Sequence, residues 1–229
     1  MKILFIFPTI FEAEPFFKFA GAGRPALGKV AHANLGSVKF VAIVSGYACE
    51  RARQRVESFA KKQNPDFAIL CGYCGACRSE QREGDFLFDT SSDKLRIAFE
   101  SVGAKPARIA CEPSVAGAER KAELAKLGYD AVDMESELLK GLFEPNAFAS
   151  FRCISDSVDS KIPAEFFDAM IDRKSGGCRF FCADMLRVLN PLRNPLLIPH
   201  LLEFSLKASK VSRHYSGKIL RLLENLAKI

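Results

Sequence analysis

The sequence lacks the pattern of a membrane-spanning or exported chain. No stretch of about 18 uncharged apolar residues, the length that a transmembrane helix needs, occurs in it. The apolar start, MKILFIFPTIFEAEPFF, is interrupted by Glu12 and Glu14, and no clean small-x-small cleavage site of a signal peptide follows it. We interpret this start as a buried strand that enters a helix, and we expect a cytoplasmic protein.

A complete ligand set for a metal ion is also missing from the sequence. Cys71, Cys74 and Cys77 are spaced three apart in LCGYCGACRSE, but a zinc or iron–sulfur site needs about four ligands. No fourth Cys or His lies nearby in the sequence. Cys71 sits in the apolar run FAILC, where cysteine behaves as a small hydrophobe. We therefore predict neither a metal nor a cofactor.

Internal repeats and low-complexity segments are absent as well. The 229 residues are 48% hydrophobic, which suits one large α/β domain better than two small ones. The net charge of +6 is uneven, because residues 190–229 hold seven Lys or Arg and only two Glu. We predict an α/β domain over residues 1–185. A basic amphipathic helical extension over residues 186–229 would pack on that domain or on a partner.

What the sequence does contain is an alternation of apolar, strand-like runs with helical patterns. The expected strands are 2–7, 29–36, 38–46, 67–72, 84–90, 108–114, 129–133 and 148–156, and the expected helices include 12–20, 48–63 and 117–128. This alternation predicts a single three-layer α/β domain, with a mixed, mainly parallel central sheet flanked by helices. Ligands in such folds gather at the carboxyl ends of the strands. Glu12, Gly72 to Gly75, Met134-Glu135 and Asp156 all fall at that edge.

Four segments, taken in order, carry a further signal: MKILFIFPTIFEAE, SGYACERARQRVESFAKKQNPDFAILCGYCGACRSEQREGDFLF, AVDMES and RCISDSVDS. Together they resemble the nucleoside phosphorylase and nucleosidase superfamily, and in particular its methylthioadenosine/adenosylhomocysteine nucleosidases. The first is similar to the family's opening strand with its catalytic Glu, the third to its ribose-binding Met-Glu, and the last to its Ile-Ser-Asp signature. The resemblance covers roughly residues 1–170.

The resemblance implies a purine nucleosidase that cleaves the N-glycosidic bond of an adenine-type nucleoside. Asp156, oriented by Ser155, would protonate the leaving base. Glu135 would hold the ribose, with Met134 packed on the sugar face, and would favour developing positive charge. Glu12 would align and deprotonate the attacking water. Three acids around one small cavity repel each other, so some of their pKa values should rise.

Each acid also has a plainer interpretation. Glu12 could simply favour a helix N-terminus through the helix dipole. Glu135 could be a solvated acid of a first helical turn, and Asp156 and Asp159 could be helix-capping acids. The joint pattern favours the site, because capping does not predict Met-Glu and Ser-Asp in this order.

Contacts to the base are implied by less specific segments. In the family, an aromatic side chain before the helix predicted here at 117–128 stacks on the purine. In this sequence that segment is CEPSVAG, and Ser114 and Val115 occupy the positions. Phe166 resembles a family residue that closes over the base, and core packing is its alternative. Ser114 and Val115 supply no aromatic ring, which argues against tight adenine stacking.

The glycine-rich segment after the buried strand at 67–72 supplies further predicted contacts. Cys74 and Gly75 lie in the part that is similar to the family's Gly-x-x-Gly loop, and we predict that both contact the substrate. Tyr73 stands where the hydrolases have a small residue. It would either narrow the pocket or point into a subunit interface.

The first loop bears on whether water or phosphate is the nucleophile. The loop PTIFEAE is acidic and has no arginine, whereas phosphate binding uses arginine together with backbone N–H groups. Ser45, with Gly46, could contact an anion, but Glu12 beside it would repel phosphate. Water is therefore favoured, and phosphorolysis is the alternative. Three arginines that could reverse this preference are not placed by the pattern: Arg24, Arg78 and Arg82.

The tail NPLLIPHLLEFSLKASKVSRHYSGKILRLL resembles the C-terminal extension of hopanoid-associated phosphorylase-like proteins, a group thought to remove adenine from an adenosylated lipid. A basic amphipathic tail could rest on an anionic membrane surface; a helix pair packed on the domain or on a dimer partner is the alternative.

The family resemblance implies a homodimer. A catalytically inactive nucleoside-binding protein stays open, whereas few aromatics interleave the basic residues, which argues against nucleic acid as a partner.

Overall fold

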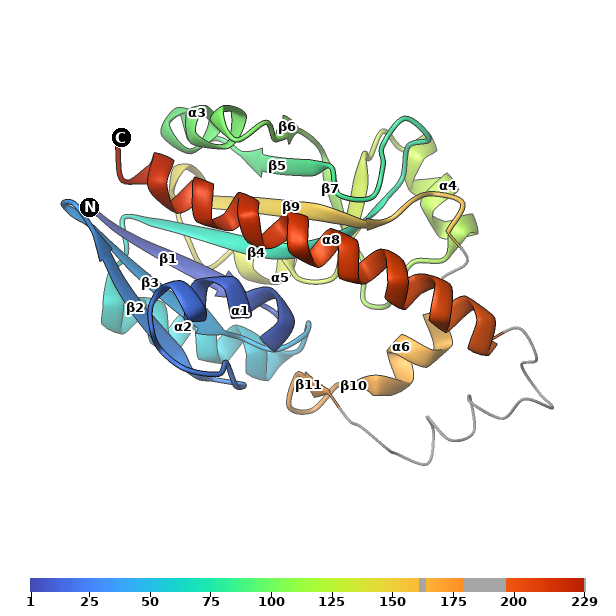
Figure 1. Cartoon of the computed structure of the whole chain (residues 1–229), viewed down its shortest axis with the longest axis horizontal. Helices are drawn as coiled ribbons and strands as arrows, with labels where there is room; N and C mark the ends of the chain where they lie inside the picture. The colour runs from blue at the N-terminus through green and yellow to red at the C-terminus, as the bar shows by residue number, and fades with distance from the viewer. Residues whose placement is uncertain (161–163, 179–196, 229) are drawn as a thin grey trace.

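A nine-stranded sheet runs through the computed structural model, which describes residues 1–160, 164–178 and 197–228 (Figure 1). The strands are β1 (Lys2–Phe7), β2 (Val30–Leu35), β3 (Val38–Val44), β4 (Phe67–Ala76), β5 (Phe86–Thr90), β6 (Lys105–Pro106), β7 (Ile109–Cys111), β8 (Ala131–Asp133) and β9 (Phe148–Asp156). The described helices are α1 (Ile10–Phe19), α2 (Glu50–Gln63), α3 (Asp93–Ser101), α4 (Ala118–Lys126), α5 (Ser136–Lys140), the short η1 (Pro145–Ala147), α6 (Ala164–Met170) and α8 (Leu197–Leu226). A separate two-stranded ribbon joins β10 (Ile171–Asp172) to β11 (Gly177–Cys178).

The strand order of the sheet is β2-β3-β1-β4-β9-β5-β6, and β8 pairs with both β4 and β7. β3, β1, β4 and β9 are parallel neighbours in the middle of the sheet. β2, β5 and β8 run antiparallel to β3, β9 and β4, respectively. The prediction of a mixed, mainly parallel sheet flanked by helices is therefore confirmed.

Local sequence signals explain where the elements begin and end. β1 is buried on both faces, as expected for a central strand of a parallel sheet. α1 begins with a capping box, in which Thr9 and Glu12 each accept a hydrogen bond from the other's backbone N–H. α2 ends at Asn64, which adopts the left-handed conformation with φ 44° at the predicted break. Gly128, with φ 86°, follows the end of α4.

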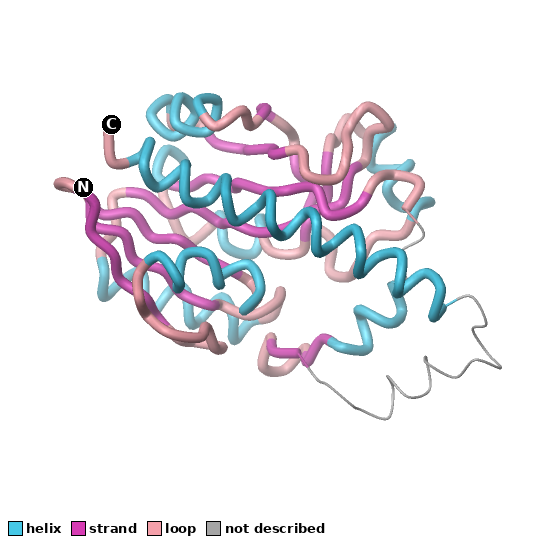
Figure 2. Tube along the Cα trace, in the orientation of Figure 1, coloured by secondary structure: helices cyan, strands magenta, loops and turns pink. Residues whose placement is uncertain are grey.

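Helices cover both faces of the sheet (Figure 2). α1, α3 and α8 pack on one face, where they share a core with side chains of β1, β4 and β9. α2 and α5 pack on the other face, where Val56 and Leu139 meet apolar residues of β1 and β4. The carboxyl ends of the parallel strands, where the site residues are predicted, lie between these two layers of helices.

α8 is one long helix that crosses the sheet from end to end (Figure 1). Its apolar stripe is buried in the main core: Val211, Tyr215, Ile219, Leu222, Leu223 and Leu226. Lys210, Arg213 and Arg221 are exposed on the same helix. In the described part of the tail, the amphipathic stripe is thus used by the domain itself. The predicted domain boundary at residue 185 lies among residues 179–196, outside the described residues.

Among the helices of the described residues, none combines the length and the apolar character that would let it cross a membrane.

Candidate active site

The sheet topology brings separated parts of the sequence to one place. β4 and β9 are parallel, and their register shifts by one residue between Cys74 and Gly75, so that Gly72 lies beside Arg152 and Gly75 beside Asp156. β8 runs antiparallel to β4, with Val132 beside Gly75. The chain that leaves β8 therefore runs back along β4, and this carries Glu135 to the neighbourhood of Arg152.

Glu12 lies at the start of α1, and its carboxylate is almost fully buried. Its Oε2 accepts a 2.8 Å hydrogen bond from the backbone N–H of Thr9, and its Oε1 accepts one of 2.8 Å from the backbone N–H of Tyr73. Burial raises the pKa of Glu12, although these hydrogen bonds and Arg152 act in the opposite direction. The helix-capping interpretation of Glu12 is thus satisfied, and the same carboxylate also faces the centre of the site.

Arg152 is fully buried at the centre of a group of acids. Its Nη2 lies 2.5 Å from Asp133 Oδ2 and 3.2 Å from Glu135 Oε2. Its Nη1 and Nε have no hydrogen-bond partner among the described residues. A Cβ atom on Gly72 would lie against the Glu12 carboxylate and 2.6 Å from Arg152 Nη1, so only glycine leaves room here. We call Glu12, Asp133, Glu135 and Arg152 the arginine cluster.

The arginine cluster holds three carboxyl groups and a single guanidinium. Burial raises the pKa of Glu135 to about 8, with Asp133 and Glu12 adding to the rise and Arg152 opposing it. Asp133 is held in place by Ser136, whose backbone N–H and hydroxyl lie 3.1 Å and 2.7 Å from Asp133 Oδ1. The predicted repulsion among clustered acids therefore contributes to the raised pKa of Glu135, whereas at Glu12 burial alone raises the pKa.

Asp156 ends β9 and is paired with a buried lysine of α4. Lys121 Nζ donates to Asp156 Oδ2 and, at 3.1 Å, to the carbonyl oxygen of Ser157. The hydroxyl of Ser155 lies 2.6 Å from Asp156 Oδ1, as the predicted orienting role requires. Burial raises the pKa of Asp156, and Lys121 and Ser155 oppose the rise. We call Lys121 and Asp156 the lysine pair.

The arginine cluster and the lysine pair lie along the same seam between β4 and β9. Gly72, beside the cluster, and Gly75, beside the pair, are three residues apart, which corresponds to about 10 Å along a strand. Cys74 lies between them, and charges of both groups act on its thiol. Burial raises the pKa of this thiol, Asp133 and Asp156 add to the rise, and Arg152 opposes it. The arginine cluster and the lysine pair are therefore neighbours on the same strands.

The predicted base-contacting residues also come together. The backbone N–H of Val115 donates to Asp168 Oδ1 at 3.5 Å. Arg173 Nη2 lies 2.9 Å from the same oxygen, and Arg173 Nη1 donates to the carbonyl oxygen of Pro113. α6, which contains the buried Phe166, is therefore tied to the segment that contains Val115.

Three other predicted residues take places of a different kind. The hydroxyl of Ser45 lies 3.3 Å and 3.1 Å from the carbonyl oxygens of Phe7 and Gly46, so its proton is used within the backbone. Tyr73 stacks at a tilt on Tyr215 of α8, with ring centroids 5.0 Å apart. Tyr73 is half-buried and packs against the core under α8, and the two expectations for it stay predictions. Met134, between Asp133 and Glu135, is half-buried.

The sequence analysis gave no role to Arg152, Asp133 or Lys121. Arg152 was detectable, because an arginine inside the apolar run FASFRCIS needs a buried partner. Asp133 and Lys121 carried no such signal, since acids and lysines are ordinary at a strand end and on a helix.

Among the described residues, no cluster of His, Cys, Asp and Glu is arranged to hold a metal ion.

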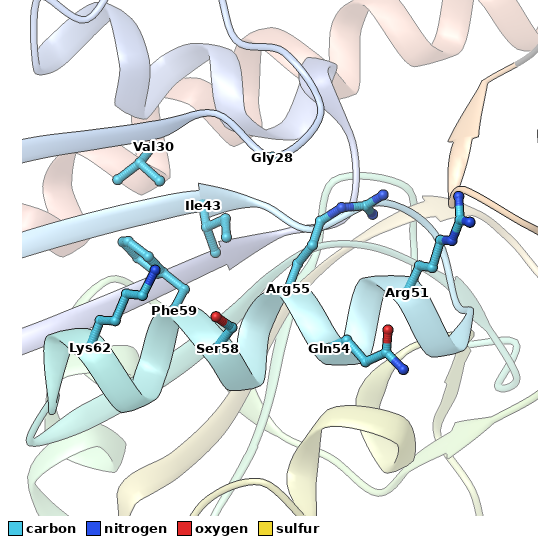
Figure 3. A pocket seen from close by; sticks show the side chains of 9 residues that line it. All are labelled: Gly28, Val30, Ile43, Arg51, Gln54, Arg55, Ser58, Phe59 and Lys62. Carbon is cyan, nitrogen blue, oxygen red and sulfur yellow. The ribbon is translucent and has the colours of Figure 1, made fainter.

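The side chains of the arginine cluster and the lysine pair are buried, and two hollows of the described residues lie away from them. One hollow of about 480 Å³ lies between α2 and the β2–β3 hairpin (Figure 3). Arg51, Arg55 and Lys62 extend from α2 around it. Arg55 Nη1 donates to the carbonyl oxygen of Ser45 at 2.7 Å. This hollow is basic and shallow, and it contains none of the predicted site residues.

Comparison with known proteins finds the same architecture. No protein-family model matches the sequence, and no curated protein matches it. The native structure of futalosine hydrolase from Helicobacter pylori strain 26695 matches with a TM-score of 0.65 at 13% identity, over 98% of this chain and 97% of that chain. H. pylori 5'-methylthioadenosine/S-adenosylhomocysteine nucleosidase with butyl-thio-DADMe-Immucillin-A matches with a TM-score of 0.65 at 14% identity, over 98% of both chains. The corresponding Campylobacter jejuni nucleosidase matches with a TM-score of 0.59 at 14% identity, over 91% of this chain and 99% of that chain.

These identities are low, so the likeness establishes the fold. It extends over nearly the whole chain, α8 included. The chain therefore has the α/β fold of these nucleosidase structures, as the sequence resemblance predicts.

Proposed function

We propose that this protein is a purine nucleosidase, which hydrolyses the N-glycosidic bond of a purine nucleoside. One observation carries the proposal: a buried group of three acids around Arg152 lies one short strand segment away from a buried Asp156. Breaking a glycosidic bond produces positive charge on the sugar and negative charge on the base. The two neighbouring groups suit these two needs.

The arginine cluster would act on the sugar. The carboxyl group of Glu135, whose pKa burial raises to about 8, can accept hydrogen bonds from ribose hydroxyls, and Arg152 holds it in place at 3.2 Å. Positive charge that develops on the ribose favours the ionised form of these carboxyl groups, and the ionised form in turn stabilises that charge. Glu12, whose pKa is raised by burial, can take a proton from the attacking water.

The lysine pair would act on the base. As the C–N bond breaks, its electron pair goes to the purine, and Asp156 delivers a proton to N7 of the leaving base. The raised pKa of Asp156 supports this role, because a proton donor must hold its proton until the bond breaks. The water oxygen bonds to the sugar carbon, Glu12 takes the water proton, and the products are free base and free sugar.

Water suits this site better than phosphate. A phosphate dianion would meet three carboxyl groups and one guanidinium that two of them already share. The hydroxyl of Ser45 lies against backbone carbonyls, which leaves no proton for an anion. Arg78, one of the unplaced arginines, pairs with Asp130 at 2.9 Å.

The test is a base-release screen of adenosine, methylthioadenosine, adenosylhomocysteine, inosine and futalosine, each with and without phosphate. Hydrolysis gives free base and a reducing sugar without phosphate, whereas phosphorolysis requires phosphate. Asp156→Asn should lower base release about 100- to 10,000-fold. Asp159→Asn, an exposed acid three residues further on, is the matched control and should leave the rate unchanged. Equal rates for the two variants would contradict the proposal.

A nucleoside-binding protein without turnover is the second candidate. The capping box of Glu12 favours it, because that bond gives the acid a structural reason to exist, and so does the lack of an aromatic residue at positions 114 and 115. Binding of a nucleoside by calorimetry, with no base release from any compound of the screen, would select this function. The homodimer and the membrane contact of the tail stay predictions.

A further inference from the structure

Lys121 is the most unusual buried group outside the roles assigned so far. Only 1% of it is exposed, although lysine is almost never fully buried unless it is paired. Its ammonium group donates to Asp156 Oδ2 and to the carbonyl oxygen of Ser157. These are its two acceptors among the described residues. An ammonium has three protons, so one proton remains for a further acceptor such as a substrate.

The position of Lys121 places this remaining proton next to the proton donor. A Cβ atom on Gly75 would lie 3.2 Å from Lys121 Nζ, 2.8 Å from its Cε and 3.0 Å from Asp156 Oδ2. The absence of a side chain at Gly75 therefore makes space for the ammonium and the carboxyl group together. α4, which carries Lys121, begins at Ala118, three residues after the predicted base contact Val115.

The purine edge that would face this pair has two neighbouring polar positions. N7 is a hydrogen-bond acceptor in every natural purine. Position 6 beside it carries an acceptor oxygen in 6-oxopurines and a donor amino group in adenine. A carboxyl group that delivers a proton to N7 therefore brings its nearest neighbour against position 6.

We propose that Lys121 is a specificity-determining residue that donates its third proton to O6, so that the site selects 6-oxopurine nucleosides over 6-aminopurine nucleosides. This inference rests on the proposed function, because it assumes that Asp156 faces N7. It reverses the adenine-type base that the sequence resemblance implies.

The chemistry of the leaving group points the same way. When the C–N bond of a 6-oxopurine nucleoside breaks, part of the released electron density resides on O6. An ammonium fixed at that oxygen stabilises the charge as it develops. The amino group of adenine would instead place two donors against each other, and the buried ammonium would lose its acceptor.

The experiment compares inosine with adenosine, which differ only at position 6 of the base. Wild-type protein should give a kcat/KM for inosine about 10- to 100-fold above that for adenosine, the range expected for one well-placed base contact. Lys121→Met removes the ammonium and should bring this ratio to within about threefold of unity. Such a ratio is smaller than the discrimination that one base contact provides. Lys126→Met, an exposed lysine of the same helix, should keep the wild-type ratio. Lys121→Gln, which restores a neutral donor, should keep part of the preference and serves if Lys121→Met does not fold.

Two results would overturn the inference: a wild-type preference for adenosine, or a Lys121 variant that slows both nucleosides equally. Binding of the free bases separates this inference from the proposed function. If the wild type releases base from neither nucleoside, the proposed function fails for these substrates. The inference is then decided by calorimetry: it holds if hypoxanthine binds more tightly than adenine and Lys121→Met removes the difference, and it fails otherwise.

Discussion

The arginine cluster and the lysine pair are equally buried but differ in charge balance. Three carboxyl groups share one guanidinium in the cluster, whereas one carboxyl group has one ammonium in the pair. A group with excess acid attracts positive charge, whereas a carboxyl group beside an ammonium gives up its proton more readily, because the ammonium stabilises the carboxylate that remains. If the proposed function holds, this difference prepares the two ends of the glycosidic bond for opposite charges.

The two groups also differ in what burial demands of them. Burial raises the pKa of both Glu12 and Glu135, and the neighbouring acids add to the rise at Glu135. In the lysine pair, burial also raises the pKa of Asp156, and the single ammonium of Lys121 opposes the rise. Removing a cation should therefore have unequal consequences in the two places.

The largest expected effect is on folding. Arg152→Met leaves three buried carboxyl groups without a cation, and we expect it to lower the free energy of unfolding by about 3–5 kcal/mol. Lys121→Met leaves only Asp156, which can keep a proton, so the loss should be about 1–3 kcal/mol. Urea unfolding of both variants measures the difference. A variant at Arg152 that is as stable as the one at Lys121 would contradict the charge comparison.

The next effect separates the two interpretations of Glu12. Glutamine also fits the third position of a capping box, so Glu12→Gln should keep the melting temperature while lowering kcat about 100-fold or more. Thr9→Ala removes the cap and keeps the carboxyl group, and should cost about 1 kcal/mol of stability with little change in kcat. Kinetics and thermal unfolding of both variants decide. If Glu12→Gln retains full activity, capping alone explains this acid.

The smallest effect is a pH dependence of stability. Folding raises the pKa of Glu135 from 4.5 to about 8, so the folded state keeps a proton that the unfolded state loses in this window. Its contribution to stability is complete below pH 4.5 and falls as pH rises to about 8. The melting temperature of Glu135→Gln, relative to wild type, should therefore increase by about 3 °C or more between pH 5 and pH 8. A difference that does not change with pH would show that Glu135 is not held protonated by folding.

Much of the architecture could be predicted because it depends on local patterns. Apolar runs separated by helical periodicity fix the order of strands and helices, and the break at Asn64 and the stop at Gly128 are local signals. The sequence analysis gave no element to residues 93–101, which form α3. Its buried Leu95, Ala98 and Phe99 follow a helical period, and Ser92 caps its start.

The interior of the site could be predicted only in part. Glu12, Glu135 and Asp156 belong to motifs, so their proximity followed from the resemblance. The cations did not, because a partner across the fold depends on strand register and helix placement. Arg152 meets Glu135 only because β8 runs antiparallel to β4, and Lys121 meets Asp156 only because α4 packs beside the end of β9.

The division of labour between the two groups can be tested with a leaving group that needs no proton. 4-Nitrophenyl riboside releases a stable anion, so the base side of the site becomes dispensable while the sugar side does not. The measurement is the rate of nitrophenolate release by Asp156→Asn and Glu12→Gln, each compared with its rate of purine release. We predict that Asp156→Asn recovers near wild-type rates on the nitrophenyl substrate, whereas Glu12→Gln remains slow on both. Equal losses for the two variants on both substrates would contradict the account.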